Sequence, residues 1–247
     1  MSLSATTFRL HRWLGWLVGV QVLIWVTGGV VFSLVPFESW VKAGDTVKPP
    51  TVVVLPQGWA ERVAPALQAA ARRGEVVAVA AVATPQGPAL RLNYRGGHES
   101  VIVPADGTTW MPPDEAAILR FASGLYQGQV EVASVERMST IPRRLGIVAE
   151  TGGRGDLWRV RFNDTLATRV YLNGRTGEFV TSRNEAWVWY DFFWRLHIMD
   201  YADGEDFNGT LLRATSIFAW GLVIAGAVLA VLAARRRWRV ARRSRLD

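Results

Sequence analysis

Histidine is the residue type in this sequence with the widest chemical use, and the chain has only three: His11, His98 and His197. His11 precedes the first long apolar stretch, and His197 lies in an aromatic segment before the second. Neutral imidazole is the usual axial ligand of b-type haem, which needs no cysteine for attachment. His11 and His197 are therefore candidate haem-iron ligands. His98, in a Gly-Gly-His turn, is expected to be exposed.

The residues that follow His11 fit the same prediction. His11, Gly15 and Gly19 recur every four residues and so share one face of a helix. Glycines beside a ligand leave room for a flat macrocycle, which makes Gly15 and Gly19 predicted cofactor-binding positions. The same Gly-x-x-x-Gly spacing also packs membrane helices closely, and this is the alternative interpretation.

Each histidine also has an interpretation without a cofactor. Beside Arg9 and Arg12, His11 can serve only to anchor a helix among lipid headgroups, and His197 can cap or snorkel at the interface. The chain has no cysteine, which excludes disulfides, thiol catalysis and zinc–thiolate sites. It has no nucleophile elbow, zinc-protease motif, phosphate-binding loop or dinucleotide fingerprint, so no catalytic residues are predicted.

Other polar residues have simpler interpretations. The acidic cluster that follows His197 is predicted to be a solvated turn, with a docking spot for a cationic complex or metal ion as the alternative. Gln21 and Thr27, inside the first apolar stretch, are expected to hydrogen-bond between helices. The cluster consists of Asp200, Asp203, Glu205 and Asp206.

Two uncharged stretches must position these residues. Residues 13–37 and 214–234 carry no charge over 25 and 21 positions, and a helix of about 20 apolar residues crosses a bilayer. Of the net charge of +7, the tail from Arg235 carries +6 and the head +2, which leaves −1 for residues 38–213. This positive-inside pattern predicts a membrane protein with cytoplasmic termini and a middle region on the opposite side of the membrane. Basic flanks beside spans predict membrane lipid as a partner and no nucleic acid.

The middle region reads as a helix followed by an antiparallel meander, twice, which predicts an α+β membrane protein. The Gly-rich residues 143–156 are predicted to be a mobile loop, and Asp114 a helix cap. Six aromatic residues within positions 187–194 predict an interfacial helix. The predicted segments are a cytoplasmic head at 1–12, transmembrane helix 1 at 13–37, a linker at 38–56, repeats at 57–110 and 111–183, the aromatic helix and acidic turn at 184–212, transmembrane helix 2 at 213–234 and a basic cytoplasmic tail at 235–247.

Geometry sets the predicted assembly. A 25-residue span separates its ends by roughly 37 Å, so His11 and His197 of one chain cannot bind the same iron. Within one chain, a bis-histidine site is possible only if His98 folds back to meet His197. A homodimer resolves this, because a two-fold axis pairs each histidine with its own mate among four helices. Such a dimer would stack two haems across the membrane.

Several motifs, in order, resemble PepSY-associated transmembrane proteins. They are LHRWLGW at residues 10–16, Gly28-Gly29, TRVYLNGRTGEFV at 168–180, and the segment from Trp187 to Tyr201. The resemblance implies a bacterial inner-membrane protein with a periplasmic domain of two PepSY-like repeats. From larger four-helix relatives it also implies a haem-linked reductase of siderophore-bound iron. This chain has two spans and no flavin or nicotinamide domain.

Two functions follow as expectations. The first is haem b-dependent electron transfer, from a cytoplasmic or membrane donor to periplasmic ferric iron or a ferric siderophore, which would make the protein an oxidoreductase. The second is a cofactor-free interaction or scaffold module anchored in the inner membrane, because PepSY domains elsewhere resemble propeptide and inhibitor modules. A homodimer or a partner membrane subunit is expected in either case.

Overall fold

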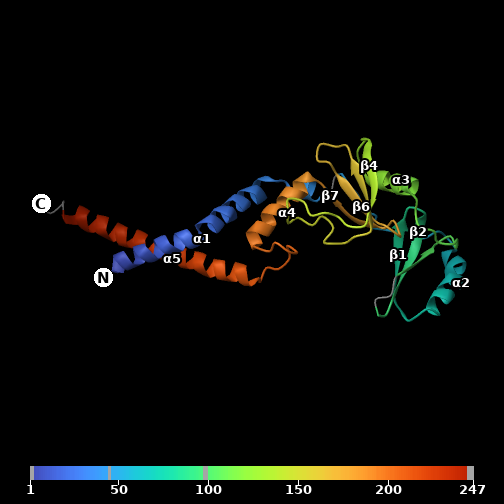
Figure 1. The fold of residues 1–247 in the computed structure, drawn as a ribbon, viewed down its shortest axis with the longest axis horizontal. Coiled ribbons are helices and arrows are strands. Elements are labelled where there is room, and N and C mark those ends of the chain that lie inside the picture. The colour runs from blue at the N-terminus through green and yellow to red at the C-terminus, as the bar shows by residue number, and fades with distance from the viewer. Residues whose placement is uncertain (1–2, 44–45, 97–99, 244–247) are drawn as a thin grey trace. The chain divides into compact units, whose positions relative to one another are not determined.

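The structure is a computed structural model that describes residues 3–43, 46–96 and 100–243. The chain divides into two compact units, which are described separately (Figure 1). The first unit comprises residues 1–34 and 190–247, and the second comprises residues 35–189.

The first unit is built on two long apolar helices, α1 (Leu3–Leu34) and α5 (Thr210–Arg243). They pack against each other through a seam that buries Leu14, Val18 and Ala225 (Figure 1). Segments 5–34 and 210–239 are each long and apolar enough to cross a membrane. The uncharged runs therefore form two helices, as predicted.

Helix α1 stops three residues before the end of the predicted span. Val35 precedes Pro36, and a residue before proline is disfavoured in the helical conformation. A short π-helix, η1 (Phe37–Val41), follows. Helix α5 continues instead through the basic residues to Arg243, so the described part of the predicted tail is helical.

The second unit begins with a helix and a three-stranded antiparallel sheet. Helix α2 spans Trp59–Ala71, and β1 (Val76–Thr84), β2 (Gly87–Tyr94) and β3 (Val101–Pro104) follow in the order β1-β2-β3. Alternate residues of the strands face the helix because the side-chain period of a strand is two. The shared core contains Val63, Ala70, Leu90, Leu92, Tyr94 and Val103.

A second helix and a four-stranded antiparallel sheet complete this unit. Helix α3 (Glu115–Leu125) begins at Asp114, whose side chain accepts the Ala117 N–H at 2.8 Å, so the predicted cap is confirmed. The strands pair in the order β4-β5-β6-β7, and their core contains Ile118, Ala122, Leu125, Val160, Phe162, Val170 and Leu172. Their bounds are β4 Val132–Met138, β5 Leu157–Phe162, β6 Arg169–Asn173 and β7 Phe179–Arg183.

Two contacts join the sheets. Arg91 of β2 donates to Glu178, with Nη1 and Oε1 2.7 Å apart. In the β6–β7 turn, Gly177 has φ +66° and lies so close to Pro85 that a Cβ there would meet the proline ring at 2.5 Å. The two sheets therefore belong to one compact unit.

The architecture confirms the predicted α+β class, with two long apolar helices flanking a domain of two small antiparallel sheets. Each sheet follows its own helix in the chain, as the repeated pattern predicted. Residues 143–156 differ from the expectation of a mobile loop. They form no long regular element, but Val148 is completely buried and Glu150 is 2% exposed, so the loop is anchored in the fold.

Candidate functional site

His11 lies at the seam between α1 and α5. Its Nδ1 is 3.1 Å from the carbonyl oxygen of Leu222, and Gly226 lies beneath the ring, where a Cβ would meet Cε1 at 3.1 Å. An imidazole that donates its Nδ1–H to a carbonyl keeps the lone pair on Nε2. Metal-binding histidines are commonly oriented by such a bond through the ring nitrogen that does not bind the metal. The α5 backbone thus fixes the orientation of the His11 ring.

The two predicted glycines have different surroundings. A Cβ on Gly15 would lie 3.8 Å from the Leu222 side chain, so Gly15 belongs to the α1–α5 packing. A Cβ on Gly19 would meet no atom within 4 Å, so this position faces open space. The shared face therefore serves helix packing at Gly15 and leaves room at Gly19.

His197 lies at the end of helix α4 (Glu185–Ile198) and packs among aromatic rings. Its ring centroid is 6.3 Å from that of Trp25, 5.7 Å from that of Phe32 and 6.5 Å from that of Trp194. Nδ1 is buried without a hydrogen-bond partner and lies 3.5 Å from where a Cβ on Gly28 would be.

Side chains of α1 also bind the end of α4. Gln21 Nε2 donates to the Leu196 carbonyl at 3.0 Å, and Trp25 Nε1 donates to the His197 carbonyl at 2.7 Å. The last carbonyls of a helix lack partners within the helix, and these two bonds supply them. The prediction for Gln21 is confirmed. The prediction for Thr27 is wrong, because its hydroxyl donates at 2.9 Å to a carbonyl one turn earlier in α1.

The structure does not bring His11 and His197 together. His197 contacts α1 at Gly28, which is 17 residues from His11 and therefore about 25 Å away along the helix. Within the described residues, no three side chains of the types that bind metals gather into one group. His98 lies outside the described residues.

The acidic turn is organised around Asp200. Its carboxylate accepts five backbone N–H groups at 2.8 to 3.2 Å, and these bonds, with that from Asp206 the largest, lower the pKa of Asp200. Its charge is thus used by the turn itself, which favours the solvated-turn interpretation. The donors belong to Ala202, Asp203, Gly204, Glu205 and Asp206.

Arg195 also holds this turn in place. This buried side chain pairs with Asp191 at 2.5 Å and donates to the carbonyls of Ala202 and Asp203, each at 3.0 Å. A buried guanidinium needs such partners, because an unpaired buried charge is costly. The connection from α4 to α5 is therefore a fixed turn.

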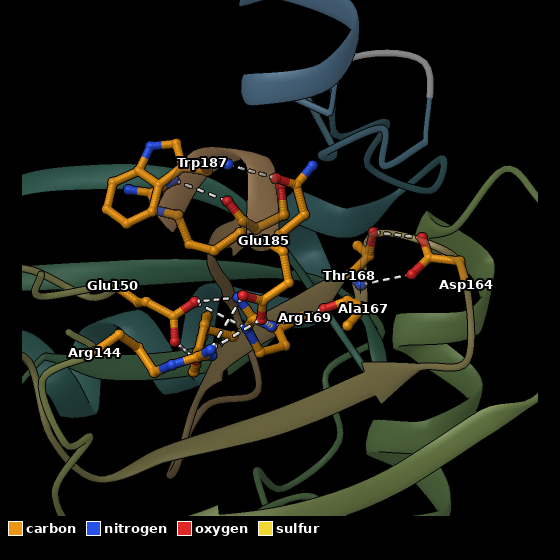
Figure 2. A network of polar contacts seen from close by, with 12 residues as sticks. Arg144, Glu150, Asp164, Ala167, Thr168, Arg169, Glu185 and Trp187 are labelled. Atoms are coloured by element: carbon orange, nitrogen blue, oxygen red, sulfur yellow. Dashed lines mark hydrogen bonds and ion pairs between the residues drawn. The ribbon is translucent and has the colours of Figure 1, made fainter. Parts of the chain in front are cut away.

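The most extensive polar network lies in the second unit, and sequence reasoning missed it. Arg169 of β6 donates to Glu150 through Nε at 2.9 Å and through Nη2 at 2.6 Å (Figure 2). Tyr171, two residues along the strand, donates to the other oxygen of Glu150 at 2.9 Å. Burial and the charge of Glu150 raise the pKa of Tyr171, so its hydroxyl stays protonated.

Glu185, at the start of α4, joins the network. Arg169 Nη1 donates to it at 2.7 Å, and Arg144 Nη2 lies 3.1 Å from each of its oxygens (Figure 2). Burial alone would raise the pKa of Glu185, but hydrogen bonds and charge from Arg169 and Arg144 outweigh it and leave the pKa lowered. The network ties the 143–156 loop and the start of α4 to the sheet.

The network also compensates for like charges that face one another in the sheet. Arg161 of β5 lies directly opposite Arg169, and Arg169 lies directly opposite Arg183 of β7. Like charges in facing positions destabilise a sheet. Glu150 and Glu185 supply the compensating negative charge at the middle of this row. We assign the network a structural role, because each of its charges has a partner.

One feature of the sequence could have indicated this network. Strand β6 alternates Arg169 and Tyr171 with Val170 and Leu172, which places a charged residue inside a strand whose neighbours are buried. A buried arginine requires a carboxylate partner. The pattern could thus have predicted a buried ion pair but not which glutamate completes it.

Comparison with known proteins gives no match to the chain among family models, curated proteins or solved structures.

Proposed function

We propose that the protein is anchored in a membrane by α1 and α5. The support is exposure: only 11% of the most apolar window of each helix is buried, so neither is the core helix of a soluble domain. Trp16, Val20 and Leu23 of α1 expose 85, 73 and 66% of their surface. Burying such side chains among lipid tails contributes on the order of 1.5–3 kcal/mol each.

The proposed orientation follows from charge. The arginines of the C-terminal tail and of the head would keep both termini in the bacterial cytoplasm, with the second unit in the periplasm. Gln21 lies well inside the uncharged stretch 13–37 and binds the end of α4. In this arrangement the end of α4 packs against α1. The resemblance to the PepSY-associated family supports the same topology.

Within that membrane unit, we propose a b-type haem bound by His11 and its mate in a two-fold dimer. The observation that carries this proposal is the His11–Leu222 hydrogen bond, which orients the ring and frees Nε2. The open space at Gly19 lies on the same helix face. Bound haem would supply one-electron chemistry, while His11 would bind iron and the Leu222 carbonyl would fix the tautomer.

His197 does not fit a haem equally well. Its Nδ1 is an unpartnered donor atom, but Gly28 and the rings of Trp25 and Phe32 occupy the surrounding space. Among the described residues, no hydrogen bond orients the His197 ring in the way that the Leu222 carbonyl orients the ring of His11. The proposal is therefore limited to the His11 pair.

The proposed role is electron transfer at the membrane, with periplasmic ferric iron or a ferric chelate as the acceptor that the family resemblance suggests. His11 lies 23 residues from the end of α1 at Leu34, or roughly 35 Å at the helical rise. Reduction at the periplasmic face of the membrane would thus need a second electron carrier, such as a partner membrane subunit.

The absorption spectrum tests the proposal. The full-length protein is expressed with ample haem, purified in mild detergent and measured oxidised and reduced. We expect a Soret band with a haem-to-chain ratio near one half, lost in His11→Gly, partly restored by added imidazole, and kept in His197→Ala. A colourless wild-type protein, or a spectrum that His11→Gly leaves unchanged, would refute haem binding at His11.

A cofactor-free interaction module is the second candidate. The observation that favours it is that His11 and Gly15 already take part in the packing of α1 against α5, which accounts for both residues without a ligand. Here the second unit would carry the function. Chemical crosslinking in membranes, followed by identification of the crosslinked peptides, tests it: contacts from residues 46–189 to another protein support it, and only self-contacts oppose it.

A further inference from the structure

Strand β1 lies at the edge of the three-stranded sheet and carries no charge. The sheet order is β1-β2-β3, so among the described residues β1 pairs on one side only. From Val76 to Leu90 the sequence has no charged residue. Edge strands are commonly protected by charged side chains, proline or a covering element, because an open edge invites another strand. The protection that β1 has is a bulge between Val76 and Ala78, at its start.

The outer side of β1 is exposed. Val77 and Val79 expose 51 and 55% of their surface, and Ala78 and Ala81 are also exposed. Val79 lies opposite Leu92, which is buried in the core shared with α2. Side chains that face each other on neighbouring strands lie on the same side of a sheet. The exposure of Val79 therefore means that α2 covers the middle of the sheet but not β1.

The main chain of β1 presents free hydrogen-bonding groups at this edge. Pro88 of β2 lies opposite Ala83 and has no N–H, and its carbonyl accepts the Ala105 N–H on the β3 side at 2.9 Å. Ala83 therefore exchanges no bond with β2. Bonding direction alternates along an antiparallel strand, so Ala81 and Val79 also direct their N–H and C=O groups away from β2. In the described part of the chain, no backbone bond from outside the sheet reaches β1.

Space for a further strand lies beside the second half of β1. A groove of about 460 Å³ has residues 81–83 on one side and residues 50–53 on the other. The charged residue of its lining, Glu178, is already bound to Arg91, with Oε1 and Nη1 2.7 Å apart. The rest of the lining is apolar except for Thr51. The groove therefore favours an uncharged strand.

We propose that β1 of a second copy of this chain pairs with this edge, antiparallel, about a two-fold axis at Ala80 or Ala81. The edge is complementary to itself, because residues 78–83 read Ala-Val-Ala-Ala-Val-Ala and each valine faces an alanine in either register. Two uncharged edges meet without repulsion, whereas a charged partner strand would find no free opposite charge there. Pairing would join two three-stranded sheets into one continuous sheet.

The inference goes beyond both proposed functions and does not depend on haem at His11. It draws on the proposed membrane anchor in one respect. Two copies held in the same membrane by α1 and α5 have a high effective concentration, so a short contact between strands suffices to pair them.

Single-cysteine variants test the pairing, because the chain has no cysteine of its own. Each of residues 78–82 is changed to cysteine in the full-length protein. The variants are oxidised with copper phenanthroline in membranes, and dimers are detected by non-reducing electrophoresis. At the axis, facing Cα atoms lie about 4.5–5.5 Å apart, which a disulfide can bridge. Two positions away, each residue is about 13 Å from its mate, which a disulfide cannot bridge.

We therefore expect one maximum of the dimer band, at Ala80→Cys or Ala81→Cys, and loss of the band two positions away. Ala116→Cys is the control, because this alanine is exposed on α3 and lies outside the edge. Equal crosslinking at all five positions, a band as strong at position 116, or no band at all would overturn the proposal. A crosslink to a protein of another mass would also overturn it, because the partner would then not be a second copy.

A proline on the edge gives an independent test. The Val79 N–H points away from β2, so Val79→Pro breaks no bond within its own sheet but blocks an added strand. In the best crosslinking variant, Val79→Pro should abolish the dimer band, whereas Val79→Thr, which keeps the N–H and the branched shape, should preserve it. Thermal unfolding close to that of the parent shows that both variants are folded. A band that survives Val79→Pro would refute pairing through β1. A colourless protein that forms the band would refute only the haem proposal.

Discussion

Arg169 and Glu150 form an ion pair that is almost completely shielded from water: Nη2 lies 2.6 Å from Oε1, and the side chains expose 4 and 2% of their surface. They come from a strand and from an irregular loop 19 residues apart. Each remaining polar atom of the pair has another partner, including Tyr171 and Glu185. Disrupting a buried pair of this kind strongly lowers stability, because removing one member leaves the other charged and unsolvated.

Glu150→Ala should therefore destabilise the second unit by about 3–5 kcal/mol, since it leaves the Arg169 guanidinium buried with only part of its compensation. The measurement is urea unfolding of the full-length protein, followed by tryptophan fluorescence. The double variant Glu150→Leu with Arg169→Met should be less destabilised than Glu150→Ala, because it removes both charges.

Glu136→Ala is the matched control. Glu136 pairs with Arg159 at 2.8 Å on a neighbouring part of the sheet, but its side chain is 46% exposed. Exposed pairs contribute about 0–1 kcal/mol, so this variant should unfold close to the wild type. If Glu150→Ala costs no more than Glu136→Ala, the buried network does not anchor the loop.

The turn before α5 should depend on pH through Asp200. The folded-state pKa of Asp200 lies below its ordinary value near 3.8, because backbone N–H groups, first that of Asp206, bind the charged form. Its stabilising effect is thus fully present above the unfolded pKa and is lost as pH falls through the folded pKa. Acidification should open the turn, as measured by hydrogen exchange of residues 202–206.

Asp200→Asn should speed that exchange at neutral pH, because an amide accepts fewer hydrogen bonds than a carboxylate. Asp203→Asn is the control, since the backbone of Asp203 takes part in the turn but its carboxylate has no partner among the described residues. Equal protection in both variants would show that the Asp200 carboxylate does not hold the turn.

Gly226→Val should disturb His11. A Cβ at position 226 would meet His11 Cε1 at 3.1 Å, so the larger valine must push the ring away from Leu222. We expect the haem content to fall by at least about half, since a ligating imidazole depends on its orienting bond. Gly29→Val in α1 is the control, because a Cβ there meets no atom within 4 Å. Equal haem content in the two variants would contradict the proposed site.

Gly177→Ala should destabilise the contact between the two sheets. The residue has φ +66°, and a Cβ would lie 2.5 Å from two atoms of Pro85. Gly146→Ala is matched for backbone strain, with φ +79°, but its Cβ would meet no atom within 4 Å. Both variants should pay roughly 1–2 kcal/mol for the left-handed conformation, and Gly177→Ala should lose more through the clash. If the two variants have equal urea midpoints, the turn accommodates the alanine side chain at position 177 with no further loss of stability.

Local patterns predicted much of the fold. The uncharged stretches predicted α1 and α5 because a long apolar run leaves few alternatives to a helix of that length. Asp114 was predictable because a cap acts within one turn of its own helix. The end of α1 was predicted three residues too late, because a count of apolar residues takes no account of Pro36.

Contacts between distant residues were not predictable. Nothing in the spacing of His197 indicates that it packs at Gly28, because that contact depends on the path of α4 beside α1. Glu150 lies in a Gly-rich segment that resembles a mobile loop, and only its partner on β6 explains its burial. The sequence did predict that His11 and His197 remain apart, since a helix of known rise fixes that separation.

The row of arginines at positions 161, 169 and 183 has a consequence for where the folding unit ends. Negative charge at the middle of the row offsets their repulsion, and Glu185 supplies part of it from beyond the last strand. A fragment that ends before residue 185 holds all three arginines but only one of the two carboxylates. We expect the four-stranded sheet of such a fragment to be less stable than that of the full chain, so the boundary of the folding unit lies inside α4 rather than at the end of β7.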